Sequence, residues 1–347
     1  MTTTAARTGA GATSLGPRRR ARRRLLGFVL AFAVLVLIGL LSLAVGTKYI
    51  PLPEVWTALF APTGSYSDTV IASRVPRTIL GLLVGAALAV AGAVMQGVTR
   101  NVLADPGILG VNVGAAAAVV TGIAFFGVGA GVGSVWVALP GAFIAVLVVY
   151  VLGSAGGRAT PVRLVLAGVV VSAVVATYIQ ALALSLPEVF NAYRFWVVGS
   201  LAGRDPQLIF DILPFIVLGL VLSLGIASPL NALALGEDTA RALGSSVGRT
   251  RILGALATTV LAAAATAGVG PIAFVGLAVP HIVRAFTGND HRWLIPGCIV
   301  LGPALLLAAD LVGRVIVSPN ELMVGVVTAF VGGPMLLLVV RRMRGAA

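Results

Sequence analysis

The sequence contains little of the chemistry on which most enzymes and metalloproteins depend. Its 347 residues include one cysteine, Cys298, and two histidines, His281 and His291. A single cysteine excludes a disulfide within the chain, and no cysteine or histidine cluster has the spacing of metal ligands. The sequence therefore predicts no catalytic residues, no metal site and no cofactor bound by this chain.

The chain also lacks the nucleotide-binding motif Gly-x-x-x-x-Gly-Lys-Ser/Thr. Its only lysine, Lys48, does not follow a glycine-rich loop. That motif is needed because its backbone amides and its lysine hold the phosphates of a nucleotide. If ATP and Mg²⁺ are used, they must be used by a separate subunit.

Charged residues are scarce as well. They make up 10% of the chain, whereas hydrophobic residues make up 59%. A soluble domain carries about 25% charged residues. The strands of a membrane β-barrel would alternate apolar and polar positions, and no such alternation is present. The composition predicts an all-α polytopic membrane protein.

Ten apolar segments are long enough to be membrane spans, for which about 20 residues are needed. Residues 1–24 precede them and are predicted to form a disordered, basic cytoplasmic tail, and residues 25–347 a single transmembrane domain. The eighth span is short, and proline and glycine flank it. The predicted spans are 25–46, 77–98, 108–128, 135–154, 163–186, 207–228, 251–269, 272–287, 293–313 and 322–340.

The net charge of +13 is distributed as a topology signal rather than as a nucleic-acid surface. Six arginines between Arg18 and Arg24 immediately precede the first span. With the N-terminus in the cytoplasm, 18 of the 24 basic residues fall on the cytoplasmic side. Cytoplasmic loops carry the excess of Lys and Arg, so an even number of spans with both termini in the cytoplasm is favoured.

One polar segment, at about 229–251, interrupts the apolar chain. It contains the charged residues Glu237, Asp238, Arg241, Arg249 and Arg251. Because Asp or Arg costs about 2.5–3.5 kcal/mol at the centre of a spanning helix, the segment must lie outside the hydrocarbon.

The same segment has the pattern of a short amphipathic helix, with Ala240, Leu243 and Val247 expected on one face. A folded cytoplasmic loop between spans suggests a docking site for a soluble partner.

Two further patterns concern the spans themselves. Similar stretches, Arg77-Thr-Ile-Leu-Gly and Arg251-Ile-Leu-Gly, open spans two and seven, which run in opposite directions. This suggests an inverted repeat of about five spans, as in many transporters. Asp105-Pro106-Gly107 predicts a helix break and a tight loop after Gln96.

Several longer motifs together resemble one family. They are SRVPRTILGLLVGAALAVAGAVMQ, RNVLADPGILGVNVGA, ALGEDTARALG, GPIAFVGLAVPHIVRAFTGNDHRWLIPG, ADLVGR and VGVVTAFVGGP, spread from residue 73 to residue 334. The chain resembles the FecCD (BtuC-like) permease subunits of ABC importers for iron–siderophore, haem and vitamin B12, and within them the ferric-enterobactin permeases. Val102 and Met323 replace prolines that the family usually has.

The resemblance implies a type II ABC importer permease fold in a bacterial cytoplasmic membrane, and it implies roles for particular residues. An ATPase-coupling loop would comprise Gly236, Glu237, Asp238, Ala240, Arg241, Leu243 and Gly244. Arg74, Arg77 and Arg314 would dock an extracytoplasmic binding protein, although surface arginines or an Asp310–Arg314 pair at i,i+4 remain alternatives. Thr160, Pro161 and Val162 would form a cytoplasmic gate, or simply the turn that opens span five.

The partners implied are a cytoplasmic ABC ATPase dimer, a second permease subunit (identical or paralogous) and a siderophore-binding protein. The expected cargo is a ferric siderophore, with haem or vitamin B12 as alternatives. An ion-coupled secondary transporter would need an ionisable site at mid-membrane. Asp105, Asp290 and Asp310 all lie near span ends, which disfavours that class. His281 is expected to be a packing residue.

Overall fold

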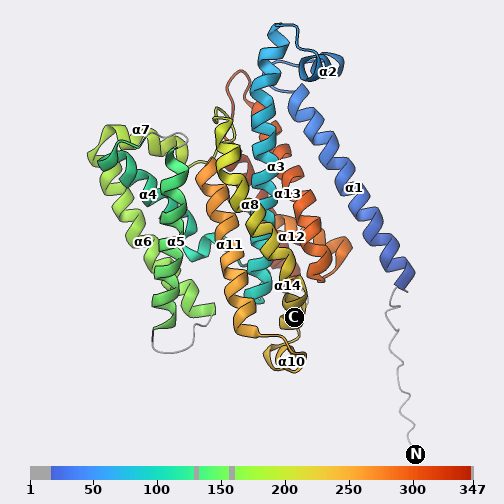
Figure 1. The fold of residues 1–347 in the computed structure, drawn as a ribbon, viewed down its shortest axis with the longest axis vertical. Coiled ribbons are helices and arrows are strands. Elements are labelled where there is room, and N and C mark those ends of the chain that lie inside the picture. Colours follow the sequence, from blue (N-terminus) through green and yellow to red (C-terminus); the bar gives the residue numbers. More distant parts are fainter. Residues whose placement is uncertain (1–16, 129–132, 156–160, 345–347) are drawn as a thin grey trace, which may run out of the picture.

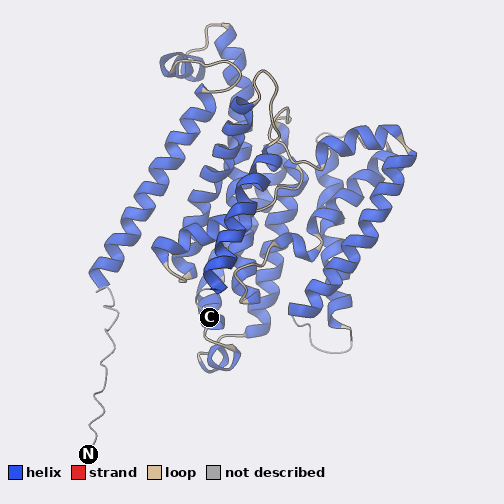
Figure 2. Ribbon diagram, turned by 180° about the vertical axis from the view of Figure 1, so that it is seen from behind, coloured by secondary structure: helices blue, strands red, loops and turns tan. Residues whose placement is uncertain are grey.

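The computed structural model describes residues 17–128, 133–155 and 161–344. Within those ranges the chain is helical and contains no strand, as the all-α prediction required (Figure 2). Ten of the helices described correspond one to one with the predicted spans. They are α1 Pro17–Ala44, α3 Tyr66–Thr99, α4 Val111–Phe126, α5 Gly133–Ser154, α6 Pro161–Ser185, α8 Gln207–Gly225, α11 Val247–Val269, α12 Val275–Thr287, α13 His291–Ile316 and α14 Val324–Arg344.

Not all ten are long. Of the helices described, seven are long and apolar enough to cross a membrane, and α4, α12 and the apolar part of α14 are shorter. The short α12 agrees with the short eighth span expected from the sequence. The remaining elements are α2 Leu52–Phe60, the 3₁₀ helix η1 Pro106–Leu109, α7 Pro187–Trp196, α9 Ala227–Ala234 and α10 Glu237–Ala242.

Two predicted boundaries were wrong. Residues 17–24 belong to α1 rather than to a disordered tail. Two arginines of this segment find partners: Arg23 donates to the Ala285 carbonyl at 2.6 Å, and Arg24 lies over the Trp293 ring. Span two begins at Tyr66, not Arg77. A capping box between Ser65 and Asp68 starts the helix earlier, and the helix continues through Pro76.

The helices run between two ends of the molecule. Figure 1 places α2 and α7 at one end, here the α2 end, and α10 at the other, here the α10 end. α1 begins and α14 finishes toward the α10 end. α3 runs from the α2 end and α11 from the α10 end, so these two helices are antiparallel as expected. The inverted repeat itself stays a prediction.

α3 lies at the centre of the bundle, with α1, α8, α11, α12 and α13 packed around it. Small residues make this close packing feasible. A Cβ added at Gly92 would overlap the backbone of Gly276 in α12, and one added at Gly85 would overlap that of Gly302 and Pro303 in α13. Between membrane helices, such close backbone approach supplies the van der Waals contact that holds them together.

We therefore expect Gly92→Ala to destabilise the protein. The new methyl group meets backbone that cannot rotate away, and overpacking of this kind costs about 1–3 kcal/mol. The loss of unfolding free energy is measured by titrating the purified protein in mixed micelles with a denaturing detergent. Gly39→Ala in α1 is the matched control, since nothing lies within 4 Å of a Cβ there. Equal stability of the two variants would contradict the packing argument.

Candidate functional site

At the α2 end, an ion-pair network centres on the carboxylate of Asp310 in α13. This side chain is fully buried. Arg77 of α3 donates to it from Nη2 at 2.8 Å and from Nε at 3.0 Å, and Arg314 donates from Nε at 2.9 Å. A buried carboxylate is tolerated only when it is paired and hydrogen-bonded, and here two guanidiniums satisfy it.

Arg314 and a third arginine, Arg74 of α3, hold the last turn of α1 and the loop after it. Arg314 donates to the Ser42 carbonyl at 2.7 Å, and Arg74 donates to the carbonyls of Leu43 and Lys48, each at 2.7 Å. The last carbonyls of a helix have no partner within it and carry partial negative charge. Cationic donors from α3 and α13 therefore fix the end of α1 to the bundle.

The three arginines expected to dock a binding protein are thus largely internal. Arg74 and Arg314 are 7% and 1% exposed. The alternative Asp310–Arg314 pair at i,i+4 is confirmed. Arg77 is the most accessible of the three, and its Nη1 donates at 2.7 Å to Glu321, whose side chain is 32% exposed. The docking role stays a prediction. Because Arg74 and Arg314 are buried, Arg77 is the arginine best placed for it.

At the α10 end, the polar segment forms two short helices, α9 and α10, rather than one. Salt bridges hold α10 in place: Glu237 accepts from Arg251 at 2.7 Å and from Arg241 at 3.1 Å, and Asp238 accepts from Arg241 at 2.9 Å. The hydrogen bond and the charge of Arg251 lower the pKa of Glu237, so the carboxylate is ionised at neutral pH.

The sequence placed Ala240, Leu243 and Val247 on one face, and for Leu243 this was wrong. Ala240 and Val247 are buried with Leu233 in a small apolar cluster. Leu243 is 64% exposed, because α10 ends at Ala242 and the chain then turns. Gly236 and Gly244, at φ 107° and 78°, make the turns on either side of α10, where a side chain would be strained.

Of the three residues predicted to form the gate, two lie in the part of the chain that the structure describes. Thr160 lies outside the described residues. Pro161 begins α6, and the side chain of Val162 is 68% exposed. The gating role of these three residues stays a prediction.

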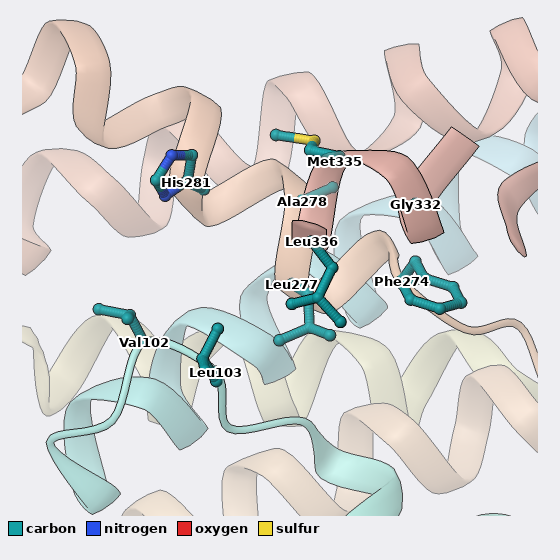
Figure 3. A pocket seen from close by; sticks show the side chains of 9 residues that line it. All are labelled: Val102, Leu103, Phe274, Leu277, Ala278, His281, Gly332, Met335 and Leu336. Atoms are coloured by element: carbon teal, nitrogen blue, oxygen red, sulfur yellow. The ribbon is translucent and has the colours of Figure 1, made fainter. Parts of the chain in front are cut away.

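The loop after α3 confirms the expected helix break. Asp105 accepts from the Gly107 amide at 2.8 Å and leads into η1. Beside this loop, a pocket of about 20 Å³ lies between Val102, Leu103, α12 and α14, and His281 lines it (Figure 3). A volume of this size holds about one water molecule, so the pocket is no cargo site.

A larger groove lies between α4, α5 and α6. Its volume is about 570 Å³, and small or apolar residues such as Ala117, Ile144 and Val171 line most of it. The hydroxyl of Thr121, which also lines it, lies 2.8 Å from that of Tyr178. Its lining contains no charged side chain, and in the described residues no group of three or more His, Cys, Asp or Glu could hold a metal ion.

Sequence reasoning missed one polar contact at the α10 end. Asn231 of α9 is hydrogen-bonded to Asp290 and His291 at the start of α13. One local signal was present for the α13 side of this contact, since Asn289-Asp290 before a new span is the pattern of a helix N-cap. The pairing with a residue about 60 positions away had no local signature.

The buried carboxylate generates a stability prediction. Asp310→Ala leaves the buried guanidinium of Arg314 without its charge partner and Arg77 with Glu321 alone, and an unpaired buried charge costs about 3–5 kcal/mol. Glu321→Ala removes a partly exposed partner of Arg77 and should cost less than about 1 kcal/mol. Unfolding in mixed micelles compares the two. Equal losses would mean that Asp310 is not the centre of the network.

The comparisons with known proteins agree with this architecture. The model of the FecCD transport family matches residues 34–342. The chain is 47% identical over 317 residues to the ferric enterobactin transport system permease protein FepD of Escherichia coli, covering 90% of this chain and 95% of that protein. It is 38% identical over 328 residues to the Fe(3+)-citrate import system permease protein YfmD of Bacillus subtilis, covering 94% and 98%.

A solved structure has the same fold over nearly the whole chain. It is a metal-chelate type ABC transporter in an inward-facing conformation, with a TM-score of 0.78 and 27% identity, covering 94% of this chain and 99% of that one. Fold, spans and relatives all indicate a multi-pass permease subunit of an ABC importer. The chain belongs to the FecCD transport family.

Proposed function

We propose that this permease moves a ferric siderophore across the cytoplasmic membrane, driven by a separate ATPase that docks at the α10 end. The observation that carries the proposal is the segment α9–α10, which is folded and charged, lies between two spans and exposes an apolar side chain, Leu243. The likeness to FepD, whose name gives ferric enterobactin as its cargo, supports the choice of cargo.

The geometry of α10 suits a force-bearing contact. Glu237 joins α10 to Arg251 at the start of α11, while Ala240 packs on Leu233 and Val247. The short helix is therefore fixed to the span that follows it. Leu243 and Leu235 are large apolar side chains of this segment that are exposed and left for a partner. An apolar anchor within a polar rim is the usual composition of a protein interface.

At the α2 end, the binding protein would contact Arg77. A carboxylate of the partner can replace Glu321 on Nη1 while Asp310 keeps its own bonds to Nη2 and Nε. Arginine is suited to such carboxylate recognition. Arg74 and Arg314 would have to release carbonyls of α1 first, so their role is to hold the docking surface rather than to form it.

The cargo path would lie between this permease and a second copy or paralogue. Uncharged surfaces such as the groove between α4, α5 and α6 carry little information about a chelate, so specificity rests mainly with the binding protein. ATP binding would draw the two ATPases together, and α9–α10 would move with them. Nucleotide needs only to reverse a difference of a few kcal/mol between outward- and inward-facing states.

Copurification tests the docking segment. Leu243→Asp places a charge at the apolar anchor, so the tagged permease should lose its ATPase in mild detergent, with recovery lowered about tenfold or more. The second permease should remain, because the α10 segment alone is altered. Mass spectrometry of the wild-type complex identifies both partners and shows whether the permease pair is mixed.

The matched control for this variant is Ala61→Asp, which introduces the same charge at an exposed position of the α2 end. It should retain the ATPase. If Leu243→Asp and Ala61→Asp retain equal amounts of ATPase, the docking surface is not at α10.

A further inference from the structure

One side chain of α9, Asn231, makes three hydrogen bonds to Asp290 and His291 at the start of α13. Asn231 donates from Nδ2 to Oδ1 of Asp290 at 2.6 Å. Its Oδ1 accepts from the backbone amide of His291 at 2.8 Å and lies 2.9 Å from Nδ1 of the same residue. The Asn231 amide is thereby bonded on both its nitrogen and its oxygen to the turn between α12 and α13.

The roles of these atoms follow from their chemistry. An amide oxygen only accepts, so Nδ1 of His291 carries the proton in this contact. The amide of Asn231 cannot be flipped, because its NH₂ would then face the two donors of His291. Asp290 is also fixed, since its carboxylate accepts from the Arg292 amide at 3.1 Å and caps α13. The contact therefore has one arrangement.

The same junction touches α3. A Cβ added at Gly97 would lie 2.7 Å from Nε2 of His291 and 3.3 Å from Leu230 of α9. The imidazole and α9 are thus packed against the end of the central helix. His291 is 5% exposed and Leu230 is fully buried, so α9 cannot shift without moving α13 or opening this junction.

α13 then connects the two ends of the molecule. It is one continuous helix from His291 to Ile316, and Asp310 lies about 30 Å along it at 1.5 Å per residue. The residue bonded to α9 and the carboxylate that holds Arg77 are therefore on one element. A displacement of α9 along or across the membrane normal can therefore reach the α2 end through α13.

We propose that Asn231 is a positioning residue that transmits movement of the ATPase-docking segment to α13. The inference rests on the proposed function and names the contact through which docking acts on the spans. A second contact, from Arg292 to the Ser228 hydroxyl at 2.8 Å, is exposed, and water can replace it, so it contributes little to the transmission.

The test uses the complete importer, with ATPase and binding protein, in proteoliposomes and with ⁵⁵Fe-labelled ferric enterobactin as the probe. Asn231→Ala removes all three bonds but leaves α10 and Leu243 unchanged. We expect the amount of iron moved per ATP hydrolysed to fall about tenfold, the scale of losing one to two net hydrogen bonds. ATPase copurification and the rate of ATP hydrolysis should stay within about twofold of wild type, since neither requires α13 to move together with α9.

Three further variants complete the test. Asp290→Asn keeps both the acceptor for Asn231 and the cap of α13, so it should retain the wild-type ratio of iron to ATP, whereas Asp290→Ala should lower it. Ser228→Ala, on the same face of α9, should leave the ratio unchanged.

Several outcomes would overturn the inference. A wild-type ratio in Asn231→Ala would show that the junction transmits nothing. Parallel loss of ATPase binding, hydrolysis and uptake would show a role in folding or docking instead. Absence of ATP-driven uptake in the wild-type importer would overturn the proposed function itself, and the inference with it.

Discussion

The structure depends on how closely other helices approach α3. In a bilayer no hydrophobic force drives helices together, so their association comes from packing and from polar contacts between them. At Gly85 and Gly92 of α3, the neighbouring backbones of α13 and α12 occupy the space of a side chain. Packing on α3 fixes the positions of α11, α12 and α13. The polar clusters at the two ends of the molecule involve residues of these helices.

The two polar clusters differ in how far they are exposed. At the α2 end, Asp310 and the arginines around it are buried, and their bonds are made within the chain, which gives a rigid platform that also holds α1. At the α10 end, charged residues lie at the surface and the side chain of Leu243 is exposed. This arrangement suits the binding of a partner protein. α13 spans both regions, so under the proposed function a movement at the α10 end can alter the α2 end.

Much of the fold was predictable, because the length of an apolar run decides whether a segment can span a membrane. The orientation expected from the distribution of arginines stays a prediction. What failed had tertiary causes. The burial of Arg74 and Arg314 depends on the carbonyls of α1 and on Asp310, which local sequence does not reveal. Leu243 turns outward because α10 ends one residue earlier, and Asn231 finds its partners about 60 residues away.

The central claim is that transport by this chain requires a separate ATPase. The most direct measurement is uptake of ⁵⁵Fe-labelled ferric enterobactin into proteoliposomes that contain the permease with or without its ATPase, in the presence of the binding protein. The account predicts uptake only with both ATPase and ATP. Uptake by the permease alone, driven by a proton or sodium gradient, would contradict it and establish an ion-coupled transporter instead.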